Sequence, residues 1–317
     1  MRKRETRGNE FLALLLAALL MPAPVHAEKN LARPPGTTRY AAMVRELNAL
    51  RRYDHAQGNR MTLTSIGQSV QGRNLWMVTL GTGPKRLLYL CRQHGHEPAS
   101  TEGALAFVHE LVKAEDGTPM AGYLQAVTVS VVPMANPDGS EAFLRHNAHD
   151  ADLNRDWIKR TQPETRALYA EISRLHPDLM TDQHELYPND TRPDFTEVVA
   201  AGSGASPSVI AAAEDAQTVV SGAMAAEGVP VVNHTITDTH PARLAHRFNS
   251  IKLGIPTVLF ETSRLAGTGR SVAQRAAAQE KFMLTLLRFL GGDRDALLAE
   301  AAGQPLPPAP VEQKGTD

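Results

Sequence analysis

The sequence predicts a single α/β domain in which a mixed, mostly parallel twisted sheet is flanked by helices on both faces. Apolar runs of strand length alternate along the chain with segments of helical periodicity, as expected of a sheet with crossover helices. The runs at 126–132 and 256–260 consist almost entirely of apolar and β-branched residues, which favours strands buried on both faces. Because neither an internal repeat nor an internal linker is visible, we predict one domain at 37–294.

The first half of this domain combines a surface helix, a hairpin and a crossover helix. Apolar residues recur at helical spacing between Tyr40 and Tyr53. A polar, glycine-bearing turn at 67–73 separates two strand-like runs, and Pro98 opens a long segment of helical periodicity. The elements predicted here are a helix at 40–53, strands at 61–66, 75–80 and 87–91, a helix at 99–112 and a strand at 126–132.

The second half alternates helices with short strands and ends in an alanine- and proline-rich segment. The strand at 126–132 runs into a dense turn signal at 133–139, where prolines cluster with Asn136 and Gly139. We expect the residues after the domain, 295–317, to form a disordered tail. The remaining elements predicted are helices at 163–175, 206–227 and 272–290, and strands at 179–184, 196–200 and 256–260.

The first 27 residues have the three parts of a signal peptide. Basic residues at 2–7 precede an apolar segment at 11–21, and Val25-His26-Ala27 fits a small-residue cleavage site. We therefore expect a linker at 28–36 and an exported protein, periplasmic or secreted, without stable membrane insertion. An uncleaved membrane anchor is the alternative, although the apolar segment is short for a bilayer span.

Composition and charge describe an ordinary globular protein. The 317 residues are 42% hydrophobic and 21% charged, and their net charge of -1 offers no basic excess for binding nucleic acid. We expect a monomer. The lone cysteine, Cys91, cannot form an internal disulfide, and at the end of an apolar run it is best interpreted as a small buried hydrophobic residue.

Polar residues of the kind that bind zinc follow the predicted strand at 87–91. His94 and Glu97 lie in the turn between that strand and the next helix, where α/β folds place their chemistry. An imidazole and a carboxylate three residues apart can bind one zinc ion. The pair is weak evidence by itself, because the same spacing is common in surface turns. His96, between the two, is expected to point away from the metal toward the surface.

Several further motifs, taken in order, resemble the zinc carboxypeptidase family over nearly the whole chain after the leader. Each motif is weak alone, but the ordered set is specific. The motifs are Gly-x-Ser-x-x-Gly-Arg at 67–73, His94-x-x-Glu97, Asn-Pro-Asp-Gly at 136–139, Asp-Leu-Asn-Arg at 152–155, His184 after a short strand, and Glu261 after the last strand.

The resemblance implies a zinc metallocarboxypeptidase that binds one zinc ion through His94, Glu97 and His184. Such a set leaves a fourth position for water, whose pKa the metal lowers. Glu261 resembles the general base that takes the water's proton and passes it to the leaving amine. Its position behind the apolar run 254–260 favours a partly desolvated carboxylate, which suits a base.

The resemblance also implies roles in binding a peptide with a free C-terminal carboxylate. Asn154 and Arg155 resemble the pair that holds this carboxylate, and a guanidinium suits the task. Arg145 resembles the arginine that stabilises the developing oxyanion, with a solvated loop arginine as the alternative. Asp152 resembles the carboxylate that orients a zinc histidine, and Asp182 is a further candidate for that role.

The chain departs from the family in the segment before the general base. Digestive members carry a tyrosine on a loop there, whereas 235–250 contains none, so we consider Tyr187 as a substitute. Asp238 is the only acid of this segment among several basic groups, which disfavours cleavage after Lys or Arg and would suit a polar or acidic side chain. Two other functions stay open: an exported zinc amidohydrolase acting on cell-wall peptide or acyl-amino-acid bonds, and a non-catalytic zinc-dependent binding module.

Overall fold

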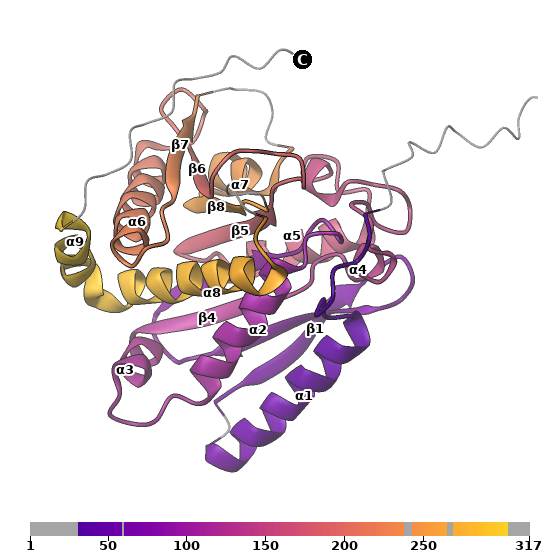
Figure 1. Ribbon diagram of the computed structural model, residues 1–317, viewed down its shortest axis with the longest axis horizontal. Helices are drawn as coiled ribbons and strands as arrows, with labels where there is room; N and C mark the ends of the chain where they lie inside the picture. The colour runs from indigo at the N-terminus through magenta and orange to yellow at the C-terminus, as the bar shows by residue number, and fades with distance from the viewer. Residues whose placement is uncertain (1–30, 59, 238–242, 265–268, 304–317) are drawn as a thin grey trace, which may run out of the picture. The chain divides into compact units, whose positions relative to one another are not determined.

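One eight-stranded sheet organises the chain, whose computed structural model describes residues 31–58, 60–237, 243–264 and 269–303 (Figure 1). The strand order is β1-β2-β4-β3-β5-β8-β6-β7. The central strands β4, β3, β5 and β8 are parallel, whereas β1, β2 and β6 each join a neighbour antiparallel. The strands are β1 Thr62–Gln68, β2 Asn74–Leu80, β3 Lys85–Cys91, β4 Val127–Val132, β5 Leu179–Glu185, β6 Phe195–Val199, β7 Val232–Ile236 and β8 Thr257–Thr262.

Helices cover both faces of this sheet, as predicted. Within β3, Leu87 and Tyr89 point to one face and Leu88 and Leu90 to the other, because side chains alternate along a strand. The first face is packed by α1, α2, α6 and α8, and the second by α5 and α7. The α-helices are α1 Tyr40–Gln57, α2 Ala99–Val112, α3 Pro119–Ala126, α4 Pro137–Ala142, α5 Pro163–Leu175, α6 Pro207–Ala226, α7 Ala245–Phe248, α8 Val272–Arg288 and α9 Arg294–Ala302.

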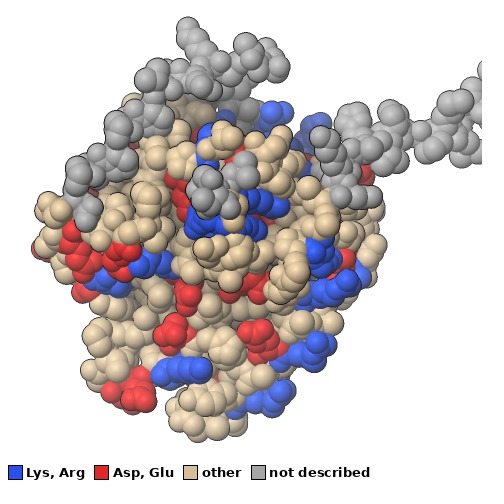
Figure 2. Space-filling model, in the orientation of Figure 1, with Lys and Arg blue, Asp and Glu red and all other residues tan. Residues whose placement is uncertain are grey.

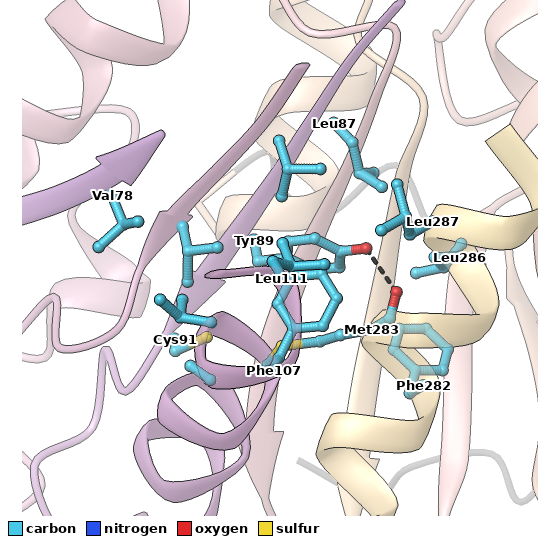
Figure 3. Close-up of a cluster of buried hydrophobic side chains, with 14 of the residues drawn as sticks. Val78, Leu87, Tyr89, Cys91, Phe107, Leu111, Phe282, Met283, Leu286 and Leu287 are labelled. Atoms are coloured by element: carbon cyan, nitrogen blue, oxygen red, sulfur yellow. Dashed lines mark hydrogen bonds between the residues drawn. The ribbon is translucent and has the colours of Figure 1, made fainter. Parts of the chain in front are cut away.

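The larger core lies between β3 and the helices α2 and α8 (Figure 3). Tyr89 and Phe107 pack edge to face with ring centroids 5.1 Å apart, and Phe282 comes from α8. The Tyr89 hydroxyl donates a hydrogen bond to the carbonyl oxygen of Met283 at 2.6 Å, so the one polar atom of this buried ring is satisfied. Cys91 is fully buried in the same cluster, which confirms its interpretation as a small hydrophobic residue.

The order of the strands opens a crevice beside β3. The chain leaves β3, passes through α2 on one face and returns as β4, then passes through α5 on the opposite face and returns as β5 on the other side of β3. The strand order reverses at β3, and ligands of open α/β sheets bind at such a topological switch point, at the carboxyl ends of the strands. The switch point here lies between β3 and β5.

Most predicted elements are confirmed, two of them to the residue. The helices at 99–112 and 163–175 begin and end where predicted, and the predicted strands agree to within a few residues. The segment of helix α4 was predicted to be a turn. It forms a helix because Pro137 suits the first helical turn and the Asn136 side chain caps the helix by accepting a hydrogen bond from the Gly139 N–H. Helix α3 and strand β7 were not predicted; Thr118 caps α3 ahead of Pro119, and β7 is a half-buried edge strand paired with β6.

The predicted disordered tail at 295–317 is wrong in its first part. Residues up to 302 form helix α9, and Leu297 is buried against Val219 and Ala223 of α6. Arg294 also pairs with Asp215 of α6 at 2.6 Å. Docking onto α6 makes this alanine-rich segment helical, because it buries an apolar residue that the segment could not bury alone. The rest of the predicted tail and the predicted signal peptide lie outside the described residues.

Candidate metal centre and substrate pocket

The turn after β3 is held by an unusual buried arginine. Arg92 has a left-handed backbone with φ of +57°, a conformation that costs energy for any residue with a Cβ. Its guanidinium is fully buried and donates to the carbonyl oxygens of Gly95 and Thr38, both at 3.1 Å. Burial lowers the pKa of Arg92 to about 10, so the group remains a cation at neutral pH. These bonds fold the turn back so that His94 and Glu97 face the crevice.

A second contact joins this turn to helix α4. A Cβ built on Gly95 would lie 2.0 Å from the carbonyl carbon of Gly139, so the two backbones touch where neither residue has a side chain. Asn136 completes the contact, since its amide donates to the carbonyl oxygens of Gln93 and Arg145. The Asn-Pro-Asp-Gly motif is therefore the support of the ligand-bearing turn.

We expect Gly95→Ala to destabilise the protein and to displace the turn that carries His94 and Glu97. The added methyl group would overlap the backbone of α4, which cannot move as a flexible side chain can. Overpacking of this kind costs about 1–3 kcal/mol of unfolding free energy, and the displaced turn should also weaken zinc binding. Denaturant unfolding and a zinc-competition titration measure both effects.

Gly122→Ala is the matched control for this variant. Gly122 lies inside α3 with open space around its Cα, so alanine there should be neutral or stabilising. Unfolding and zinc affinity of Gly95→Ala equal to those of the wild type would contradict the supporting role of the contact.

The remaining motif, the hairpin between β1 and β2, is tied to α4 by Asp138. Its carboxylate accepts hydrogen bonds from the Ser69 hydroxyl at 2.7 Å and from the Gln71 backbone at 2.9 Å, and pairs with Arg73. The hairpin motif and the Asn-Pro-Asp-Gly motif thus bind each other.

His94, Glu97 and His184 form the group within the described residues that could hold a metal ion. Nδ1 of His94 lies 2.8 Å from Oε1 of Glu97, and Nδ1 of His184 lies 2.8 Å from Oε2 and 3.1 Å from the other Nδ1. Tetrahedral zinc ligands lie roughly 3.3 Å from one another, given zinc–ligand bonds of about 2.0–2.2 Å. The three side chains therefore fit zinc after a shift of a few tenths of an ångström.

Two carboxylates hold the opposite nitrogens of these histidines. Asp152 lies 3.1 Å from Nε2 of His94, as the resemblance implied. Asp182 lies 3.0 Å from Nε2 of His184 and also accepts from the Gln93 amide at 2.6 Å. A carboxylate accepts only from an Nε2–H, so each ring in its neutral form keeps its lone pair on Nδ1, the atom that faces the other ligands.

The electrostatics of this group favour a cation among the three side chains. Burial opposes the charge on Glu97, yet His94 and His184 outweigh it and hold its pKa well below the ordinary value. Burial also opposes a charge on His184, but Asp182 and Glu97 raise its pKa well above the ordinary value. Without a metal, a proton on His184 takes the place of the positive charge between two buried carboxylates, and zinc binding would release it.

Glu261 lies on the neighbouring strand, at the register position opposite His184. Its Oε2 is buried and has no hydrogen-bond partner among the described residues. Burial raises the pKa of Glu261 to about 8; His184 acts against this, while Glu97 and Asp182 add to it. A carboxylate poised near neutrality is suited to exchange protons, and a nearby cation would favour its charged form.

A pocket of about 250 Å³ connects these groups with the predicted substrate-binding residues. Arg145 donates to Asp152 at 2.9 Å and lies over the Tyr187 ring, 5.4 Å from its centre. Arg155 is exposed and makes no ion pair with an acid in the described part of the chain. Asn154 is buried and already engaged: its oxygen accepts from the Ala245 N–H, and its amide nitrogen lies 3.1 Å from Nε2 of His184. Carboxylate binding by Asn154 stays a prediction.

The structure corrects one expectation and adds residues that the motifs did not indicate. His96 is outside the ligand group, but it is buried against Tyr187 rather than on the surface. Glu197, Asp190 and Arg192 also line the pocket. The sequence offered one sign that Glu197 has a functional role: it is the only acid in the otherwise apolar or uncharged strand 195–199. The predicted specificity residue Asp238 lies outside the described residues.

Residues 47–185 match the family model described as zinc carboxypeptidase. The segment that holds His94, Glu97 and His184 therefore resembles the zinc carboxypeptidase family. It is 26% identical over 148 residues to a zinc carboxypeptidase of Saccharothrix mutabilis, and 32% identical over 130 residues to mouse carboxypeptidase M. These matches cover 44% and 33% of the chain, and the chain spans only 33% and 29% of the two relatives.

Solved structures show the zinc carboxypeptidase fold over most of the chain. The superposition on a metallo-carboxypeptidase from Burkholderia cenocepacia spans 80% of this chain and 69% of that protein, with a TM-score of 0.66 at 24% identity. The superposition on a metallo-carboxypeptidase from Pseudomonas aeruginosa, in complex with (2-guanidinoethylmercapto)succinic acid, spans 82% of this chain and 69% of that protein, with a TM-score of 0.61 at 22% identity. These likenesses confirm the predicted fold class.

Proposed function

We propose that this chain is a zinc-dependent metallocarboxypeptidase that hydrolyses the C-terminal peptide bond of peptides with a free terminal carboxylate. One observation carries the proposal: a single pocket is lined by His94 and Glu97 of the ligand group that His184 completes, by the unpartnered carboxylate of Glu261 and by the exposed guanidinium of Arg155. Ligands, base and anion-binding group are the parts that such a reaction needs.

In this proposal the three ligands hold one zinc ion. Bound zinc supplies a Lewis acid and lowers the pKa of water toward neutrality. Glu261 accepts a proton from the attacking water and delivers it to the nitrogen of the leaving amino acid. Arg145, whose guanidinium lies 3.9 Å from Glu97 Oε1, is close enough to the ligands to stabilise negative charge on the scissile carbonyl oxygen.

Arg155 is the residue best placed to hold the terminal carboxylate. Its fork of donors matches a carboxylate, and in the described structure it donates only to a backbone carbonyl at 3.1 Å. Tyr187, with 45% of its surface exposed at the pocket, is the aromatic group available to cover the substrate.

One observation favours the amidohydrolase as the second candidate. The Asn154 side chain is occupied by His184 and Ala245, which leaves Arg155 without its expected partner in carboxylate recognition. An enzyme that ignores the terminal carboxylate would need neither residue for binding.

The two candidates differ in their response to Arg155→Met. For a carboxypeptidase we expect the variant to raise KM for C-terminally free peptides roughly 10- to 100-fold, since it loses a charge-assisted hydrogen bond. Wild type and variant are compared on a mixed pool of free and amidated peptides, with Arg174→Met, which removes an exposed ion pair with Glu171, as control. Equal cleavage of free and amidated peptides by the wild type would favour the amidohydrolase.

We also propose that the protein is exported and acts as a monomer on peptides. The basic and apolar leader supports export, and none of the helices among the described residues is long and apolar enough to cross a membrane. Figure 2 shows Lys and Arg interspersed with Asp and Glu over the visible face, and the net charge is -1, which supports a role without nucleic acid.

A further inference from the structure

The part of the pocket beyond the predicted metal ligands has apolar walls and one internal ion cluster. Leu186, Phe195, Leu244 and Leu259 contribute the apolar surface. The whole pocket, including its end at the metal ligands, has a volume of about 250 Å³, below the roughly 300–1,000 Å³ of sites for drug-sized ligands, so the part beyond the ligands has room for a single side chain.

The cluster is centred on Glu197 of β6. Its Oε1 lies 2.8 Å from Nε2 of His246 and accepts from the Arg247 guanidinium at 3.0 Å. Both cationic residues belong to α7, which packs beside β6 and β8 (Figure 1). All three side chains are largely buried, with 17%, 2% and 12% of their surfaces exposed. Burial opposes the charge on Glu197, but His246 and Arg247 outweigh it and lower its pKa to about 2.

A carboxylate at this position would attract a lysine or arginine side chain, but here the protein's own cations already occupy it. Two other lining acids are engaged as well: Asp190 pairs with Arg192, and Glu185 with Arg275. An incoming ammonium would meet Arg247 and, apart from Glu261 beside the predicted metal ligands, would find no uncompensated acid in the described pocket. Like charges brought together in this way are a strong means of rejecting a ligand.

We infer that this pocket accepts C-terminal residues with neutral or acidic side chains and excludes Lys and Arg, and that Arg247 is the residue that sets this specificity. The inference rests on the proposed carboxypeptidase function. The carboxylate of Glu197 could bind a basic side chain of the substrate, but Arg247 neutralises its charge.

The test replaces Arg247 by methionine, which keeps much of the side-chain volume and leaves Glu197 with one cation fewer. Fluorescein-labelled peptides ending in Lys, Arg, Ala, Leu, Asp or Glu are titrated against zinc-loaded protein carrying Glu261→Gln, so that binding is measured without turnover. We expect Arg247→Met to shift the affinity ratio toward Lys and Arg by roughly 10- to 100-fold. Adding Glu197→Gln should reverse that shift, because the gain depends on the freed carboxylate.

Two further variants complete the design. Arg294→Met, which removes the exposed pair with Asp215, should leave the affinity ratio unchanged. If Arg247→Met does not fold, Glu197→Gln alone should shift the ratio toward Asp and Glu, because it removes the negative charge of Glu197 from the pocket. Equal wild-type affinity for Lys and Ala termini, or no shift in either variant, would overturn the inference. Binding that follows this pattern without hydrolysis by the enzyme with Glu261 intact would instead overturn the proposed function alone.

Discussion

Glu261→Gln is expected to reduce kcat about 10²- to 10⁴-fold while the protein keeps one zinc ion. Glutamine matches the shape of glutamate but cannot accept the proton of the attacking water. The Oε2 atom of Glu261 is buried and unpartnered in the described structure, so an amide loses no existing hydrogen bond there. The fold and the three ligands should therefore remain intact, and the loss should fall on turnover.

The measurement combines steady-state kinetics on C-terminally free peptides with a zinc assay on the same preparation. Glu280→Gln, a half-buried acid on α8 away from this pocket, is the matched control and should retain wild-type rates. A Glu261→Gln enzyme within tenfold of the wild-type kcat would remove Glu261 from the role of general base. Loss of zinc would show that the carboxylate supports the metal site instead.

His184→Ala is expected to lower zinc affinity by more than the roughly 10- to 100-fold seen when only a supporting partner of a ligand is changed. His184 is fully buried, faces both other ligands through Nδ1 and is held by Asp182 through Nε2. Without it two ligand side chains remain, and the carboxylates of Glu97 and Asp182 lose the cationic partner between them. Peptide hydrolysis should fall to background at any zinc concentration that does not inhibit the wild type.

Thermal unfolding provides a readout that does not depend on activity. Zinc at about 100 times its Kd should stabilise the wild type by about 2.7 kcal/mol, whereas His184→Ala should gain much less at the same concentration. His109→Ala changes a half-buried histidine of α2 that pairs with Glu46 of α1, and it should respond to zinc like the wild type. An unchanged zinc-dependent stabilisation of His184→Ala would remove His184 from the ligand set.

The metal centre could be predicted from sequence because its parts follow strands in a regular way. His94 and Glu97 follow β3, His184 ends β5 and Glu261 ends β8, and parallel strands bring their carboxyl ends to one edge of the sheet. The local spacing His-x-x-Glu then determines which side chains can reach one ion. The structure places His94, Glu97 and His184 together as the resemblance implied.

The substrate pocket was much less predictable. Glu197 meets Arg247 only because β6 lies antiparallel to β8 and α7 packs beside both strands, a contact between residues fifty positions apart. The engagement of Asn154 by Ala245 and His184 is likewise long-range. Neither residue type nor spacing reveals whether a polar side chain is already occupied by a distant partner.

The sequence by itself determined the alternation of strands and helices and the ends of α2 and α5, and its resemblance to zinc carboxypeptidases implied the predicted zinc ligands. The elements depend on hydrophobic period and helix-starting prolines, which act within a few residues. Only the tertiary structure decided that α4 and α9 are helices, that Gly95 and Gly139 must both lack a side chain, and that Glu197 is neutralised within the protein. Packing and charge pairing settle these features, because both depend on which distant segments the sheet brings into contact.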